Sequence, residues 1–101
     1  MTDVNPDNLE NRLKEYLGRT VPSHAASDIH AALVLADILK TRGYTFHLKD
    51  LCPGSPDQTR WQAVFFKHDY EFSADHPDAP VAVCTAAIGA LSTLETTFSL
   101  S

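Results

Sequence analysis

The sequence predicts an α+β fold: a three-stranded antiparallel meander sheet between helices, that is, an α/β/α layered sandwich with the element order α-α-β-β-β-α. Residues 61–66 (WQAVFF) are apolar on both faces of a strand, because alternate side chains point to opposite faces. Two stretches that alternate on one face flank them, and stretches with helical apolar spacing precede and follow the three. A strand that is apolar on both faces needs cover on both sides, so we expect helices above and below the sheet.

The first helix is expected from Pro6 to about Leu17. An asparagine before Pro6 is a good cap, and proline suits the first helical position. The apolar residues form one narrow stripe at helical spacing: Leu9, Leu13, Tyr16 and Leu17. Gly18 ends the helix. We expect this short helix to cover part of one face of the sheet.

A second, longer helix is expected from about Ser27 or Asp28 to about Arg42. Ser27 is a suitable cap, Asp28 suits the positive end of the helix dipole, and Gly43 stops the helix. The predicted buried stripe consists of Ile29, Leu33, Ala36 and Leu39, widened by Ala32, Leu35 and Ile38.

Three strands are expected next. Residues 44–49 alternate between apolar and polar, and residues 50–59 form a loop rich in turn residues. The central strand is expected at about 60–67, and His68 and Asp69 form a tight turn. Residues 70–73 alternate again and predict the third strand, which completes the meander.

Residues 75–80 are expected to break the sheet and to start a third helix near Asp78 or Ala79. Its predicted buried stripe consists of Val81, Cys84, Ala87, Ile88, Leu91 and Leu94. The two long helices would cover one face of the sheet. Residues 96–101 alternate like a strand but also fit a frayed tail. All 101 residues are expected to form a single domain.

The net charge of -5 is unevenly distributed. Four acidic residues and no lysine or arginine lie between His68 and Asp78, so this segment carries -4. An acidic surface repels phosphate, which disfavours direct nucleic-acid binding and favours a protein partner with a basic surface. The predicted partner-binding residues are Asp69, Glu71, Asp75, His76 and Asp78, together with the apolar tail residues Phe98 and Leu100.

The sequence also predicts the compartment. No stretch approaches the ~18 consecutive apolar residues of a membrane span. Residues 1–7 are polar and acidic, unlike a signal peptide. Cys52 and Cys84 lie far apart and form no CxxC pair. We expect a cytoplasmic protein with two reduced thiols and no membrane partner.

Neither a metal site nor catalysis is predicted. Zinc needs three or four converging ligands, and the spacing of the five histidines matches no ligand motif. Cys52 in its loop is a candidate nucleophile, but the chain has no GxSxG, HExxH or glycine-rich phosphate loop. We therefore assign no catalytic residue, metal or cofactor. Trp61 is interpreted as a core residue rather than a stacking platform for a base or sugar.

Two runs, 21–32 (VPSHAASDIHAA) and 74–87 (ADHPDAPVAVCTAA), resemble the helix-opening and closing patterns of the phage ABA-sandwich domain family. The resemblance covers about residues 20–91. It implies an α/β/α layered fold and residence in bacteriophages or prophages, with action in the cytoplasm of the bacterial host. It implies no established activity and no catalytic residues. Members often carry aromatic residues after the proline-rich lead, where this chain has His24, Ala25 and Ala26.

Three functional hypotheses follow. The first is a small phage-type accessory protein that binds a host or phage protein. Its specific form is a counter-defence inhibitor, such as an anti-CRISPR, whose acidic surface docks on a basic nucleic-acid-binding site. The second is a binder of a nucleotide or signalling metabolite in a cleft beside the central strand, near Trp61 or Tyr70. The third is a small hydrolase-type enzyme that uses Cys52 or the histidines. A homodimer formed by pairing of edge strands is a further hypothesis, because a three-stranded sheet has two edges.

Overall fold

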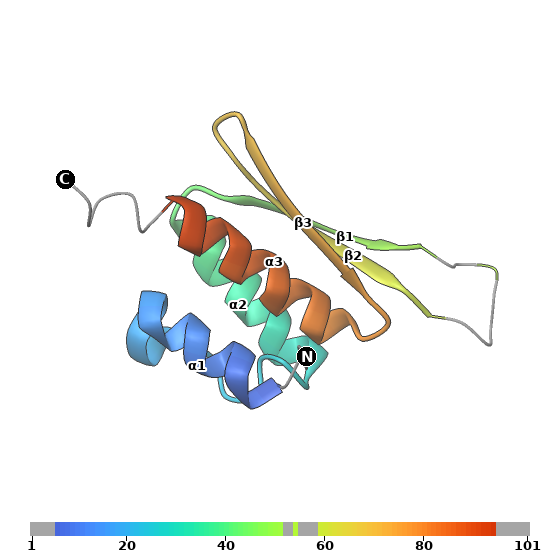
Figure 1. Ribbon diagram of the computed structural model, residues 1–101, viewed down its shortest axis with the longest axis horizontal. Coiled ribbons are helices and arrows are strands. Elements are labelled where there is room, and N and C mark those ends of the chain that lie inside the picture. Colours follow the sequence, from blue (N-terminus) through green and yellow to red (C-terminus); the bar gives the residue numbers. More distant parts are fainter. Residues whose placement is uncertain (1–5, 52–53, 55–58, 95–101) are drawn as a thin grey trace.

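The computed structural model describes residues 6–51, 54 and 59–94, which form three α-helices, a short 3-10 helix and one sheet (Figure 1). The elements in chain order are α1 (Pro6–Leu17), the 3-10 helix (Gly18–Thr20), α2 (Ile29–Thr41), β1 (Thr45–Asp50), β2 (Trp61–Lys67), β3 (Tyr70–His76) and α3 (Ala79–Leu94). The strands pair antiparallel in the order β1-β2-β3. The predicted α+β class, the element order and the meander are confirmed.

The order of the layers differs from the predicted sandwich. Helix α3 packs against β2 and β3, and α2 lies beside α3 and contacts β1, so the two long helices cover one face of the sheet as predicted (Figure 1). Helix α1 packs on α3 on the side away from the sheet. Helix α1 therefore does not cover the second face of the sheet. The physical reason lies in α3, which has no charged residue and buries most of its described side chains. A helix that is apolar all round needs neighbours all round, and the leucine stripe of α1 supplies one.

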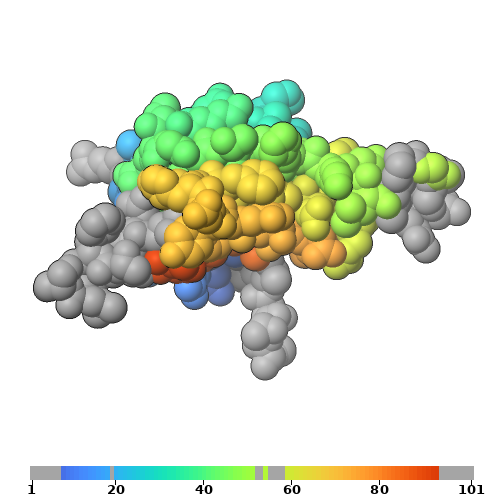
Figure 2. Space-filling model, turned by 90° about the horizontal axis from the view of Figure 1, so that it is seen from above, coloured from blue at the N-terminus to red at the C-terminus, as the bar shows by residue number. Residues whose placement is uncertain are grey.

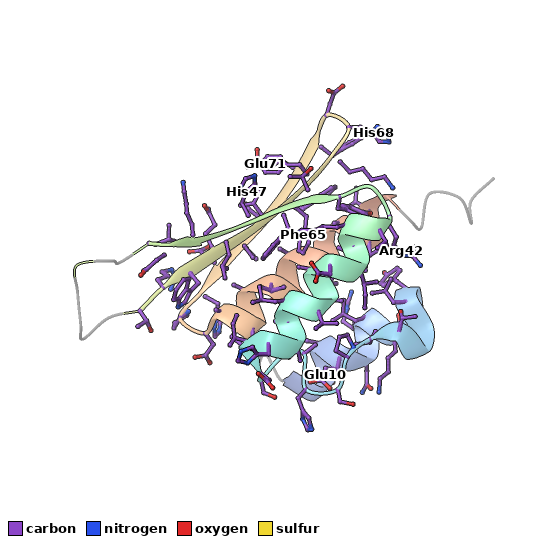
Figure 3. The ribbon with its side chains drawn as sticks, turned by 180° about the vertical axis from the view of Figure 1, so that it is seen from behind. Glu10, Arg42, His47, Phe65, His68 and Glu71 are labelled. Carbon is purple, nitrogen blue, oxygen red and sulfur yellow. The ribbon has the colours of Figure 1, made fainter. Side chains whose placement is uncertain are left out.

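The core lies between the sheet and α3 and extends to α1. Phe65 on β2 is fully buried, and its ring centroid lies 6.3 Å from that of Tyr44 and 5.0 Å from that of Phe46. Figure 3 shows Phe65 on the helix side of the sheet. Leu13 of α1 and Leu91 of α3 are also fully buried. Ala63 and Phe65 thus face the helices, while Val64 and Phe66 lie on the other face, as the alternation along β2 requires.

Helix α2 begins at Ile29 with Asp28 as its cap, because the Asp28 carboxylate accepts a hydrogen bond from the His30 N–H at 3.0 Å. Its buried residues are Ala32, Leu35, Ala36 and Leu39. Leu33, which the periodicity places in the buried stripe, is 39% exposed. Since α2 packs on α3, the small residues Ala32 and Ala36 face inward and allow the two helices to approach closely.

Strand β3 extends three residues beyond its predicted end. Asp75 pairs with Gln62 and His76 with Trp61, so the sheet does not break at Asp75 as predicted. The predicted turn at His68 and Asp69 is confirmed, and His68 adopts a left-handed backbone conformation with φ of 57°.

Candidate functional site

The four predicted acidic residues follow β3 from one end to the other. Asp69 lies in the turn before the strand, Glu71 and Asp75 lie on it, and Asp78 directly precedes α3. All four are exposed. Because a strand advances ~3.3 Å per residue, Glu71 and Asp75 lie roughly 13 Å apart along β3. The acidic side chains therefore form a line along an edge strand rather than a compact patch.

Asp75 is partly neutralised by Arg60. The Arg60 Nε donates a hydrogen bond to Asp75 Oδ2 at 2.7 Å, and each side chain is 47% exposed. Such an exposed pair adds little stability, but it places a cation inside the segment that looks purely acidic in the sequence. The two residues are 15 positions apart, and only the register of β2 with β3 brings them together.

His76 and Asp78 meet in a local contact at the start of α3. The Asp78 N–H donates a hydrogen bond to His76 Nδ1 at 3.0 Å, and the Asp78 carbonyl accepts one from the Ala82 N–H at 3.1 Å. His76 is half-buried, while Asp78 is exposed. His76 thus has a structural part in the turn into α3, and the Asp78 carboxylate remains accessible to a partner.

No described helix packs on the second face of the sheet. We call this surface the open face; Figure 2 shows the molecule from this side, and Figure 3 places His47 and Glu71 on it, opposite Phe65. The strand register arranges its side chains in three rows that cross the sheet. The rows are Thr45–Phe66–Glu71, His47–Val64–Ser73 and Lys49–Gln62–Asp75.

The centre of the open face is apolar. Val64 is only 7% exposed although it stands outside the core cluster, so its neighbours on this face shield it. Phe66 is half-buried, and the His47 ring packs edge-on against it with 5.6 Å between centroids. The open face therefore combines an apolar centre on β2 with polar and charged side chains on β1 and β3.

A groove of about 380 Å³ lies where the loop before α2 meets the starts of β2 and α3. Its wall is mostly apolar, with two polar residues, and consists of Ala26, Ser27, Trp61, Pro77, Asp78, Ala79, Pro80 and Val81. This volume falls within the range of small-molecule sites. Trp61 is half-buried and packs against the core, as interpreted from the sequence, but it also forms part of this wall.

Cys84 is the one cysteine in the described part of the chain, and it is fully buried on α3. Burial, together with the nearby charge of Glu10, raises the pKa of the Cys84 thiol from 9.0 to about 12. Glu10 lies on α1 and accepts a hydrogen bond from the Ala26 N–H at 3.3 Å. Since the thiolate is the reactive form, Cys84 is unsuited to nucleophilic chemistry near neutral pH.

Among the described residues, no three histidine, cysteine, aspartate or glutamate side chains are placed to hold a metal ion. The histidines are dispersed over the loop before α2, α2 itself, β1, the β2–β3 turn and the end of β3. No helix in the same part of the chain is long and apolar enough to cross a membrane. Three residues singled out in the sequence, Cys52, Phe98 and Leu100, lie outside the described residues.

Comparison with known proteins adds no relative. A scan against protein-family models and searches of curated proteins and of solved structures returned no match. The resemblance to the phage ABA-sandwich domain family therefore stays a prediction.

The residues that sequence reasoning missed are Arg60 and Lys49. The alternation along β2 does place Phe66 on the face opposite Phe65, and only the expected cover of that face by a helix was wrong. Arg60 and Lys49 carry no such signal, since their neighbours come from other strands.

Proposed function

We propose that this protein works by binding another protein with the acidic side of its sheet. The observation that supports this best is the exposed line of carboxylates along edge strand β3, beside a sheet face that no described helix covers. Asp69 and Glu71 form the end of this line of carboxylates that lies at the β2–β3 hairpin. Residues 68–76, the turn and β3, contain no lysine or arginine. Charge complementarity of this kind speeds encounter with a basic partner and disfavours acidic ones.

In its specific form, the proposal is a phage-type accessory protein that acts in the bacterial cytoplasm as a counter-defence inhibitor, such as an anti-CRISPR. Its acidic hairpin end would occupy a basic surface on which a host complex binds nucleic acid. The resemblance at residues 21–32 and 74–87 and the small size of the chain support this form. The absence of a catalytic motif in the sequence favours binding over catalysis.

The double variant Asp69→Lys/Glu71→Lys tests the proposal. We expect it to weaken capture of the partner from bacterial host lysate by at least about 10-fold, because two attractive contacts become repulsive. Affinity is measured with the captured protein after its identification by mass spectrometry. The double variant Glu15→Lys/Asp37→Lys is the matched control, since it makes the same charge change at exposed positions on α1 and α2. Equal loss in both variants, or none in either, contradicts the acidic mechanism.

The groove at Trp61 supports a second candidate, binding of a nucleotide or signalling metabolite. Its apolar wall suits a planar ring, and the Asp78 carboxylate favours a neutral or cationic group over a phosphate beside it. A ligand would therefore insert its base or apolar part and leave its phosphates in solvent.

Trp61 is the only tryptophan of the chain, so its fluorescence reports directly on the groove. If this candidate is right, at least one member of a nucleotide and metabolite panel produces a saturable change in Trp61 emission. Ser27→Phe, which fills the groove, is expected to abolish the change, and Ser23→Phe, on the same loop but outside the groove wall, to preserve it. A flat response of the wild type across the panel rules this candidate out.

A further inference from the structure

In the described part of the chain, helices cover one face of β2 and leave the other uncovered. One face, with Ala63 and Phe65, is buried in the core, while Val64 and Phe66 lie on the open face. Sheets usually cover a face with an apolar centre by a helix or by a second sheet about 10 Å away. We therefore expect another surface to pack on the open face.

The charges of the open face balance. Lys49 and Arg60 are cationic, Glu71 and Asp75 are anionic, and the sum is 2 − 2 = 0 although the whole chain carries -5. A copy of the same chain could approach this face without concentrated repulsion. A strongly basic partner finds no excess of negative charge over the open face as a whole. The excess arises only at its hairpin end, where Asp69 in the turn adds to Glu71.

The arrangement of these charges is self-complementary. Consider two sheets stacked face to face, with a two-fold axis between them that runs parallel to β2. This axis places β1 of one copy over β3 of the other, and each row of one copy over the same row of the other. In the row Lys49–Gln62–Asp75, the operation puts Lys49 over Asp75 of the second copy, twice. In the other rows it stacks Val64 on Val64 and Phe66 on Phe66. A two-fold axis across the strands would instead put β1 on β1 and β3 on β3.

We propose that the open face is the contact surface of a homodimer, in which two copies pack their sheets face to face about this axis. Val64 and Phe66 form the apolar centre, and two Lys49–Asp75 pairs flank it. Asp75 accepts a hydrogen bond from Arg60 of its own chain through Oδ2 and is 47% exposed, so its carboxylate can also accept one from Lys49 of the second copy. Aligned sheets pack at about 30° to each other, and the long lysine side chain spans the resulting offset. This dimer differs from pairing of edge strands, which would leave the open face exposed.

The size of the face sets the strength of the contact. Three strands spaced ~4.8 Å apart and about six residues long give a footprint of roughly 300 Å² per copy. Stable specific complexes bury about 800 Å² per partner. The dimer is therefore expected to be weak, with a Kd on the order of 100 μM, and to form at high local concentration.

The test exchanges charge between the two edges of the open face. Sedimentation equilibrium over about 10–500 μM is measured for the wild type, Lys49→Glu, Asp75→Lys and an equimolar mixture of the two variants. Lys49→Glu opposes two carboxylates across the axis, and Asp75→Lys opposes two ammonium groups. We expect each variant alone to self-associate at least about 10-fold more weakly than the wild type. In the mixture every facing pair is again of opposite charge, so heterodimers are expected to form with near wild-type affinity.

Lys14→Glu on α1 is the control, because it makes the same charge change at an exposed position away from the sheet. Circular dichroism and thermal unfolding verify that every variant is folded. A wild type that stays monomeric throughout the range overturns the proposal. So does self-association that neither single variant weakens, which would place the contact away from Lys49 and Asp75, or a mixture that fails to recover. The result does not depend on the partner-capture experiment, because it needs only this chain.

Discussion

Replacing Phe65 with alanine is expected to lower the free energy of unfolding by about 3–5 kcal/mol. The side chain is fully buried at the centre of β2, and it contacts the rings of Tyr44 and Phe46. Its loss removes apolar area and leaves a cavity between the sheet and α3. Since a domain of this size is typically stable by about 5–15 kcal/mol, the variant would be marginally folded. Urea denaturation followed by circular dichroism measures the change.

The adjacent Phe66 provides a matched control. It is half-buried on the open face and no described helix lies over it, so Phe66→Ala is expected to cost about 1 kcal/mol. The comparison is made at low micromolar protein concentration, where self-association through the open face contributes nothing. Similar losses for the two variants would mean that the second face is covered, contrary to the arrangement of the described residues.

Raising the pH is expected to destabilise the protein through Cys84. The pKa of its thiol is raised from 9.0 to about 12, chiefly by burial and secondarily by Glu10. The folded state therefore keeps the thiol proton in a range where the unfolded state has lost it, so stability falls as pH rises. The contribution of the protonated thiol to stability is fully present below about pH 9 and is lost as the pH rises toward 12. By pH 12 the loss amounts to roughly 4 kcal/mol.

Cys84→Ala isolates this effect from the other groups that titrate at alkaline pH. The variant loses some stability at neutral pH because it leaves a small cavity. Between about pH 9 and 11 its free energy of unfolding is expected to fall less steeply than that of the wild type. Parallel curves for the two proteins would show that the Cys84 thiol ionises normally.

Local patterns in the sequence were sufficient to predict the positions of most helices, strands and turns. The caps and stops around α2, the alternation in β1 and β2, and the turn at His68 and Asp69 act over a few residues, and their predicted positions agree with the structure to within about two residues. The end of β3 was missed because cross-strand partners of Asp75 and His76 prolong the strand. The residues next to Asp75 and His76 in the sequence do not indicate these cross-strand partners.

The placement of α1 was missed for a different reason. The sequence shows that β2 is apolar on both faces, and cover by α1 was the simplest expectation. Helix α3 has more apolar surface to bury, because it carries no charged side chain. Burying this helix on several sides stabilises the fold more than covering Val64 and Phe66, so α1 packs on α3. The uncharged stretch 79–94 was a signal for this arrangement.

The candidate site was only partly predictable. The exposed carboxylates of Asp69, Glu71 and Asp78 could be found from the charge distribution alone. The pairing of Asp75 with Arg60 and the groove at Trp61 depend on segments that are distant in the chain. The Arg60–Asp75 pair leaves the excess of negative charge at the hairpin end, where Asp69 adds to Glu71.

The sequence by itself determined the helices, the strands, their order and the α+β class, because hydrophobic periodicity, caps and turns act between near neighbours. Tertiary structure alone decided which face of the sheet stays open, which cation meets Asp75, and where Trp61 borders a groove. These features follow from strand register and from competition between apolar surfaces for cover. Both are properties of the whole folded chain, since a helix can cover only one of the surfaces that need it.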